Sequence, residues 1–391
     1  MLSVHVVLYV LMMILIYIFA YIDYRKKRSA WQISHISFIV PCYNDGDSVW
    51  ITIKSIYESC VDLTIDVVVV NDKSTDNSFE VLQNLQKEYN FLLIQNPHNM
   101  GKVQTLNNNI YHLQSDIFFV IDADVTLNTK AVKDLLSRFS NDPRIGWVSC
   151  PYIPTNGGFF ARMQRIEYNM LMIIQWSYNI FSAISLWGGC LAVRRDAFEQ
   201  AGRFSINAIT EDMDLAFKLN KYNWKVQQSF VAIHSIVPDT LRTRYKQKIR
   251  WNSGGTQAFL TYMSIWIKNP LHVAVMFLFN FLMFFSAYQF FQTITGIYNI
   301  WDIMTFKIFL NMFGILRGDT ILRDALRKWS FMLLSFPYII PLLQKRTDWY
   351  KVFLLIPFSL IYIPVYTIVG FVWAFVGFKR YRELQPWVRA W

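Results

Sequence analysis

The chain has 391 residues, of which 54% are apolar, 17% aromatic and only 17% charged. This composition excludes a disordered or fibrous chain. The net charge is +11, and most of it lies at the two ends of the chain. Residues 1–30 hold 4 basic and 1 acidic residue, and residues 270–391 hold 12 basic and 5 acidic residues. Residues 31–269 are nearly balanced, with 22 basic and 21 acidic residues. Because the excess lies beside long apolar runs, it is typical of the cytoplasmic flanks of membrane helices and argues against a nucleic-acid partner.

The N-terminal region is predicted to be a transmembrane helix. Residues 3–22 form an apolar run without formal charge, long enough to cross a bilayer. The basic residues follow this run at 25–28, whereas a signal peptide would carry its positive charge first. By the positive-inside rule, we expect the N-terminus outside and the chain from residue 25 onward in the cytoplasm.

The last third of the chain is predicted to return to the membrane. Residues 271–298 and 352–378 are long enough to span it, whereas 303–316 and 330–343 are as compatible with interfacial or re-entrant segments. Residues 317–329 place apolar and basic side chains at helical spacing, which favours a helix on the cytoplasmic surface. We expect three spans in the whole chain and one or two more, with the basic tail favouring a cytoplasmic C-terminus.

Residues 31–269 are predicted to form one cytoplasmic α/β domain. Short, continuously apolar runs alternate with segments of helical periodicity, which indicates a sheet buried on both faces. The expected order is strand 36–41, helix 47–59, strand 66–71, helix 76–89, strand 91–96, helix 101–112 and strand 116–122. This alternation predicts an open, mostly parallel sheet flanked by helices, with ligands at the carboxyl ends of the strands.

Several other chemistries lack support in the sequence. The four cysteines, at 42, 60, 150 and 190, form no CxxC pair, and we expect reduced thiols. The six histidines show no zinc-binding spacing. The chain has neither a GxGxxG fingerprint nor a GKS/T loop, which excludes the usual dinucleotide and P-loop sites.

Polar residues follow the first two predicted strands. Pro41 and Tyr43 lie at the end of the first, and Asp72 follows the second, where a carboxylate can accept hydrogen bonds from a nucleobase or a ribose. Asp76, four residues on, is expected to cap the next helix. Lys102, at a helix start, is either a ligand for a phosphate or base carbonyl or a solvated lysine.

Two acidic motifs follow. Asp122 and Asp124 come after the fourth buried strand, and they are either a turn or a site for Mg²⁺ or Mn²⁺ with the phosphates of a substrate. Glu211 and Asp212 begin a predicted helix. One of this pair, most readily Asp212, could be a general base, but an N-cap explains the pair equally well.

A basic segment completes the set. On a helix, Gln247, Arg250 and Trp251 project from one side. The guanidinium could stabilise a leaving diphosphate, and the indole could stack on a sugar ring. The alternative is a basic helix that lies on the membrane surface.

In this order, the residues resemble the processive, membrane-embedded family 2 glycosyltransferases with a GT-A fold, the group of the cellulose, chitin, hyaluronan and poly-N-acetylglucosamine synthases. The resemblance covers residues 36 to about 262 and rests on Asp72, Asp122-Ala123-Asp124, Thr210-Glu211-Asp212 and Gln247-x-x-Arg250-Trp251. The bacterial poly-N-acetylglucosamine type is the most similar. The resemblance implies a GT-A nucleotide-diphospho-sugar transferase domain inserted between transmembrane helices of an inner or plasma membrane.

The resemblance also implies roles for the motif residues. Asp72 and Lys102 would contact the uridine part of a donor, with Pro41 and Tyr43 nearby. Asp122 and Asp124 would serve the diphosphate and the metal, and Asp212, beside Glu211, would be the base. Gln247, Arg250 and Trp251 would line the site where diphosphate leaves and the acceptor stacks. The segment Trp187-Gly188-Gly189-Cys190 is similar to the loop that holds the acceptor end.

Two motifs depart from the family pattern. The usual DDGS-like turn reads Asn71-Asp72-Lys73-Ser74, and the usual GKAxALN reads GKVQTLN from Gly101. Neither departure removes a charged group.

The expected function is an inverting transfer that polymerises a UDP-sugar, best UDP-N-acetylglucosamine, into a β-linked polysaccharide, with coupled export as a further hypothesis. The expected partners are the donor, the growing polysaccharide, membrane lipids and an accessory membrane subunit, with Mg²⁺ or Mn²⁺ as cofactor. Two alternatives stay open: transfer of a single sugar to a lipid carrier, and a non-catalytic membrane subunit or transporter.

Overall fold

The computed structural model describes residues 4–26, 33–179 and 187–263. Helix α1 (Val4–Tyr24) covers most of the predicted first span. Within these ranges, no helix combines the length and the apolar character required to cross a membrane. The spans and the surface helix predicted after residue 270 lie outside the described residues, as does the boundary predicted at residue 269.

The strands form two sheets. They are β1 (His35–Cys42), β2 (Thr64–Asn71), β3 (Leu92–Gln95), β4 (Ile117–Ile121), β5 (Val125–Thr126), β6 (Ile145–Ser149), β7 (Tyr152–Pro154), β8 (Cys190–Arg194), β9 (Lys225–Gln228) and β10 (Ile233–Ser235). Seven of them make one sheet in the order β3-β2-β1-β4-β8-β6-β9, and β5-β10-β7 make a second, smaller one. The four predicted strands are confirmed, each to within two residues at either end.

The larger sheet is mostly parallel, as predicted. The pairs β1–β2, β1–β4, β2–β3 and β6–β9 are parallel, whereas β8 runs antiparallel between β4 and β6. The carboxyl ends of β1, β2 and β4 therefore meet at one edge. This edge receives the residues that follow each strand, so Asp72 and Asp122 lie on the same side of the sheet.

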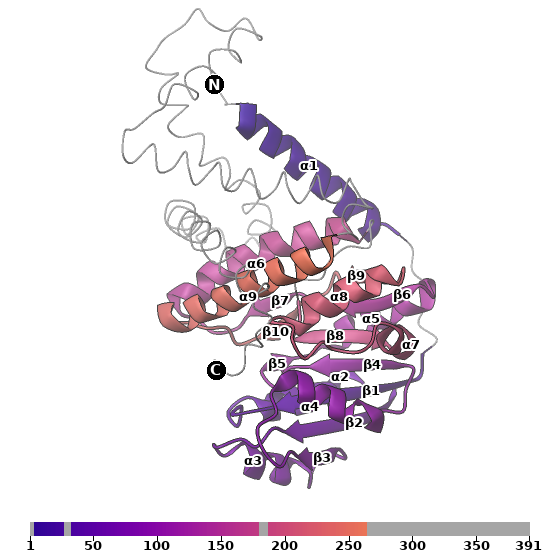
Figure 1. Ribbon diagram of the computed structural model, residues 1–391, viewed down its shortest axis with the longest axis vertical. Coiled ribbons are helices and arrows are strands. Elements are labelled where there is room, and N and C mark those ends of the chain that lie inside the picture. The colour runs from indigo at the N-terminus through magenta and orange to yellow at the C-terminus, as the bar shows by residue number, and fades with distance from the viewer. Residues whose placement is uncertain (1–3, 27–32, 180–186, 264–391) are drawn as a thin grey trace, which may run out of the picture.

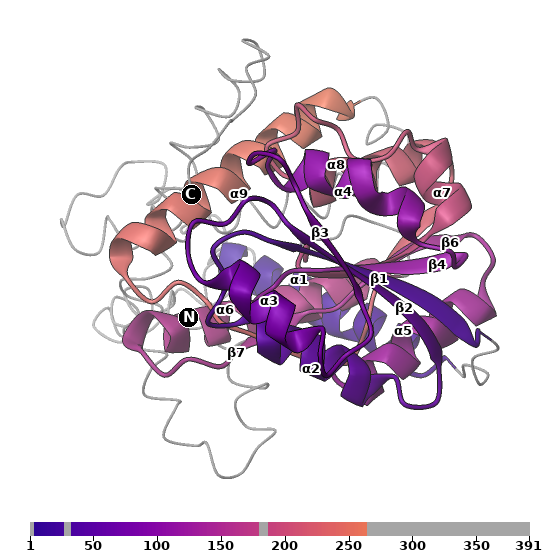
Figure 2. The same ribbon diagram turned by 90° about the horizontal axis from the view of Figure 1, so that it is seen from below.

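The helices cover both faces of the larger sheet (Figure 2). In chain order they are α2 (Val49–Ser59), α3 (Ser78–Leu85), α4 (Lys102–Asn109) with a 3-10 turn (Ile110–His112), α5 (Thr129–Asn141), α6 (Phe159–Tyr178), α7 (Arg195–Gln200), α8 (Glu211–Lys221) and α9 (Leu241–Thr261). Helices α2, α3 and α5 lie on one face, and α4, α7 and α8 lie on the other (Figure 2). The predicted helices at 47–59, 76–89 and 101–112 are confirmed.

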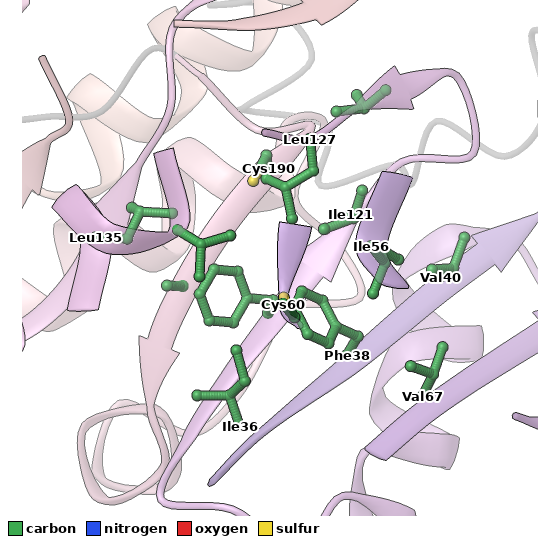
Figure 3. Close-up of a cluster of buried hydrophobic side chains, with 14 of the residues drawn as sticks. Ile36, Phe38, Val40, Ile56, Cys60, Val67, Ile121, Leu127, Leu135 and Cys190 are labelled. Carbon is green, nitrogen blue, oxygen red and sulfur yellow. The ribbon is translucent and has the colours of Figure 1, made fainter. Parts of the chain in front are cut away.

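The core has two halves, one on each face of the sheet. Phe38 packs on the α2 side beside Phe119, with ring centroids 4.8 Å apart, whereas its neighbour Ile39 points to the α4 side. Figure 3 shows the first half, with Ile56 of α2 and Leu135 of α5 packed against the strands. Because successive strand residues point to opposite faces, continuously apolar strands are what a sheet covered on both sides requires.

Helix α1 is tied to the domain at its last turn (Figure 1). Asp23 is only 1% exposed. Its carboxylate lies 3.6 Å from the Arg138 guanidinium of α5 and accepts a hydrogen bond from the side chain of Asn179, which follows α6 (2.9 Å). The four cysteines are buried and free, in agreement with the expected reduced thiols.

Candidate active site

Asp72 directly follows β2 and organises the loop before α4. Its carboxylate accepts hydrogen bonds from the Asn96 side chain (2.7 Å) and from the backbone N–H groups of Met100 (2.8 Å) and Gly101 (2.8 Å). Gly101 has a φ of 79°, which favours glycine, and α4 starts at the next residue, Lys102. Asp72 is 3% exposed and so positions the loop that carries Lys102. Its contact with a uridine stays a prediction.

Lys102 bridges two carboxylates from different parts of the chain. Its ammonium lies 2.6 Å from Asp122 Oδ1, just after β4, and 2.9 Å from Glu211 Oε1, at the start of α8. Burial lowers the pKa of Lys102, but the charges of Asp122 and Glu211 outweigh burial and raise it above its ordinary value. The two acidic motifs are therefore joined through this lysine, which is not a solvated surface residue.

Negative charge concentrates after β4. Burial, followed by the charges of Asp122 and Asp45, raises the pKa of Asp124 to about 7. Burial also raises the pKa of Asp45, which follows β1, to about 6. Crowded carboxylates of this kind suit a divalent cation with oxygen ligands, such as Mg²⁺ or Mn²⁺. In the described part of the chain, no three His, Cys, Asp or Glu side chains form a metal site.

The two acids at the start of α8 lie in different environments. Although burial opposes it, the charges of Lys102 and Arg250 hold the pKa of Glu211 below its ordinary value. Burial and the charge of Glu211 raise the pKa of Asp212 to about 6. The N-cap position is Thr210, so neither acid is the cap. Glu211 is engaged in an ion pair, and Asp212 is the carboxylate suited to accept a proton near neutral pH.

The segment at Gly188 and Gly189 runs between the two acidic motifs. A Cβ on Gly188 would lie 2.1 Å from Asp212 Oδ2, and a Cβ on Gly189 would lie 3.0 Å from Asp122 Oδ2 and 2.5 Å from the Tyr152 hydroxyl oxygen. The carbonyl of Gly189 also accepts a hydrogen bond from the Asp122 N–H (2.8 Å), and its own N–H donates to the Tyr152 hydroxyl. A side chain would clash at both positions, with the Asp212 carboxylate at Gly188 and first with the Tyr152 hydroxyl at Gly189.

Trp187 supports this loop from beneath. Its indole is 1% exposed and lies edge-on to the rings of Tyr152 and Tyr168, each with centroids 5.1 Å away. Its Nε1–H donates to the Gln228 side-chain oxygen (2.9 Å). Cys190, the next non-glycine residue, begins β8 and is buried. The acceptor role predicted for this segment stays a prediction, and Gly188 is its one partly exposed residue, since Trp187, Gly189 and Cys190 are buried.

Helix α9 brings the basic motif to the same place. A Cβ on Gly254 would lie 2.3 Å from Thr210 Oγ1, so the close approach of α9 to the start of α8 depends on this glycine. The charge of Arg250 acts on both acids at the start of α8. Trp251 is half-buried against the aromatic cluster of Trp187 and Tyr168. The buried Gln247 side-chain oxygen accepts no hydrogen bond from residues 4–26, 33–179 or 187–263.

The structure therefore brings most of the predicted residues together. Pro41 and Tyr43 lie at the end of β1 beside the end of β2, and their roles toward a donor stay predictions. Two further residues of the site were not predicted. Asp45 follows a strand, and the rule that ligands bind at strand ends could have identified it. Tyr152 comes from the small second sheet, for which the sequence holds no recognisable signal.

Residues 37–202 match the family model described as Glycosyl transferase family 2. The fold and this match define the class: residues 37–202, fewer than half of the chain, are similar to family 2 glycosyl transferases, which supports a glycosyltransferase. The predicted enzyme class is confirmed. The acidic pair at the start of α8 and the Gln247–Trp251 motif follow the matched residues.

The particular proteins that the chain resembles are poly-beta-1,6-N-acetyl-D-glucosamine synthases. The protein from Staphylococcus epidermidis is 27% identical over 238 residues, which cover 60% of this chain and 58% of that protein. The protein from Staphylococcus aureus is 26% identical over 233 residues, which cover 59% and 56%. The chain thus matches less than two thirds of the length of these relatives. The predicted likeness to this group is confirmed.

A solved structure supports the fold. A mannosyltransferase from Pyrobaculum calidifontis, in complex with GDP-Man and Mn²⁺, superposes with a TM-score of 0.58 and 19% identity, over 93% of this chain and 94% of that one. At this identity the likeness concerns the fold alone. It confirms the predicted GT-A type α/β domain with a mostly parallel sheet.

Proposed function

We propose that the chain is an inverting, processive glycosyltransferase that polymerises a UDP-activated sugar, with UDP-N-acetylglucosamine as the donor, into a β-linked polysaccharide. One observation carries the proposal: the Gly188–Gly189 backbone lies against Asp212 on one side and Asp122 on the other. A carboxylate suited to be a base and a carboxylate suited to a metal diphosphate therefore flank the same short loop. The names of the similar synthases support the choice of donor and product.

The chemistry follows from the charges around this loop. Asp212 accepts the proton of the acceptor hydroxyl as that oxygen attacks the anomeric carbon of the donor. The bond from this carbon to the diphosphate oxygen breaks, and UDP leaves with the electron pair. Arg250 and Lys102 offset the charge that develops on the diphosphate. Attack from the opposite face inverts the configuration at the anomeric carbon.

The carboxylates after β4 fit a divalent cation. Asp124 has a raised pKa because burial and two neighbouring negative charges disfavour its ionised form, and a cation relieves that cost. Asp122 and Asp124 would hold Mg²⁺ or Mn²⁺ together with the donor diphosphate, where the ion supplies charge stabilisation for the leaving group. The mannosyltransferase of similar fold was solved with Mn²⁺ and a nucleotide sugar, which agrees with this assignment.

The proposal includes a membrane location, with the catalytic domain in the cytoplasm and the N-terminus outside. It rests on the apolar run 3–22, on the apolar C-terminal third and on the basic residues beside them. Growing polymer would pass from the site to the membrane region that follows residue 269. Purified protein in sealed vesicles would test this step, because polymer that stays fully accessible to an added external hydrolase contradicts coupled export.

The decisive experiment incubates membranes that contain the chain with individual UDP-sugars and Mg²⁺ or Mn²⁺. UDP release and product length are scored together. Long product from UDP-N-acetylglucosamine supports the proposal, whereas a product with one added sugar on a lipid supports the non-processive alternative. If Asp122→Asn and Asp212→Asn leave the cellular function intact, the protein is a non-catalytic subunit and the proposal fails.

A further inference from the structure

Three charged side chains are buried together between α6 and α9, which lie side by side (Figure 1). Glu167 of α6 and Arg244 and Lys248 of α9 are 4%, 5% and 3% exposed. The Glu167 carboxylate accepts from the Arg244 guanidinium at 2.5 Å and from the Lys248 ammonium at 2.6 Å. Each carboxylate oxygen thus holds one cation, and α9 is fixed against α6 at two points one helical turn apart.

The same lysine contacts the tryptophan of the basic motif. Lys248 Nζ lies 4.3 Å from the centroid of the Trp251 ring, three residues further along α9. Tyr168, the neighbour of Glu167 on α6, is 6.3 Å from the same ring, with an interplanar angle of 31°. Trp251 is only half-buried, so part of its ring stays open while Lys248 and Tyr168 hold the rest.

Stability alone does not account for this cluster. Taking charges out of water costs several kcal/mol per ion, so apolar side chains of the same volume would often be at least as stable. Burial and the charge of Arg244 lower the pKa of Lys248 to about 8, even though Glu167 opposes this shift. The lysine is held in its charged form at a cost, and its ammonium also lies against the Trp251 indole.

We propose that Glu167 and Lys248 are positioning residues that hold the Trp251 indole as a wall of the acceptor site. The inference rests on the proposed function, because it assigns Trp251 to the acceptor side. Glu167 fixes the ammonium, the ammonium fixes the ring through a cation–π contact, and the ring then presents a constant face to the sugar. Lys248 is at a position that the QxxRW pattern leaves open to any residue. In this chain, its ammonium holds the tryptophan of the pattern in place.

Lys248→Met in the full chain tests this assignment. Methionine has a similar length, and Glu167 and Arg244 then remain as a one-to-one pair, so the protein is expected to fold. Loss of the cation–π contact should raise the KM for a soluble β-linked N-acetylglucosamine oligosaccharide about tenfold. The KM for UDP-N-acetylglucosamine and the slow release of UDP without acceptor should not change. Lys248→Arg keeps the cation and should restore the acceptor KM.

Lys246→Met is the matched control, because Lys246 lies on the same helix, two residues away, and is exposed. An active Lys248→Met protein with the acceptor KM of the wild type, or an equal rise in Lys246→Met, overturns the inference alone. A failure of wild-type membranes to form product from any UDP-sugar overturns the proposed function, and the inference falls with it. A melting temperature below that of wild type for Lys248→Met, without rescue by Lys248→Arg, assigns the cluster to stability and also overturns the inference.

Discussion

Two ion clusters of the described chain have reversed compositions. In the open cluster, Lys102 contacts two acids, Asp122 and Glu211, and these three side chains are 24%, 35% and 11% exposed. In the closed cluster, Glu167 contacts two bases, Arg244 and Lys248, and none of these three side chains is more than 6% exposed. The first group is thus partly exposed to solvent, and the second is buried.

The difference in exposure should decide whether a cluster can exchange its ion-pair partners. In the open cluster, we expect that water or a substrate cation can replace Lys102 at Asp122, because these side chains remain partly solvated. In the closed cluster such an exchange is disfavoured, because removal of the Glu167 carboxylate takes a charged partner from two cations in a dry environment. We therefore expect substitutions in the open cluster to change catalysis, and substitutions in the closed cluster to change stability or geometry.

The largest effect on activity is expected for a substitution of Asp212, the residue that follows Glu211 of the open cluster. Asp212→Asn removes the base and should lower kcat by about a thousandfold. The midpoint of thermal unfolding at pH 7 should not fall, because the substitution also removes a buried charge next to Glu211. UDP release and calorimetry on the same preparation check both statements. An active Asp212→Asn protein would show that another group accepts the proton.

The next effect concerns the closed cluster. Glu167→Gln removes the carboxylate that both Arg244 and Lys248 contact and should lower the free energy of unfolding by about 3 kcal/mol. Denaturant titration of the purified protein measures this loss. Glu199→Gln is the control, because its ion pair with Arg203 joins side chains that are 42% and 43% exposed and should contribute little. Equal losses for both variants would contradict the distinction between open and closed clusters.

In the open cluster, Lys102→Met should leave the protein folded but weaken donor use. The substitution removes the cation between Asp122 and Glu211, and loss of such a charge-assisted contact should reduce kcat/KM for the donor by about fiftyfold. Steady-state kinetics with varied UDP-sugar check the change. Lys54→Met, which removes an exposed lysine of α2, should leave kcat/KM at the wild-type value.

The smallest effect is the response of the wild type to pH. The pKa of Asp212 is raised from 3.8 to about 6, and only the ionised form accepts a proton. Activity should therefore be maximal above this pKa and fall about tenfold for each further pH unit below it. A pH–rate profile between pH 5 and 8 measures the acid limb. A limb centred near pH 4 would show that Asp212 is not perturbed.

The sequence predicted the part of the fold in which strands and helices alternate along the chain. Strands β1 to β4 are continuous apolar runs, and the rule that ligands lie at strand ends placed Asp72 and Asp122 correctly at one edge. Strand β8 and the second sheet were not predicted, because β8 follows a long helix and the small strands have two or three residues each. Pairing over such distances depends on tertiary contacts that local periodicity does not encode.

The candidate site likewise has features that the sequence predicted and features that only the tertiary structure shows. The charges of Lys102, Glu211 and Asp212 were named from the sequence, but their mutual distances and the separate pKa shifts of the two acids follow only from the packing of α4 against α8. Trp187 was expected in the loop that holds the acceptor end, and the structure places its ring in the interior. The sequence around an aromatic residue that precedes two glycines does not predict whether its ring is buried or exposed.

The buried Asp23 also limits how the molecule can move. The last turn of α1 cannot swivel against α5 without separating the Asp23 carboxylate from Arg138 and Asn179 in an environment with little water. A change in the direction of α1 therefore requires a matching movement of α5 and of the residue that follows α6.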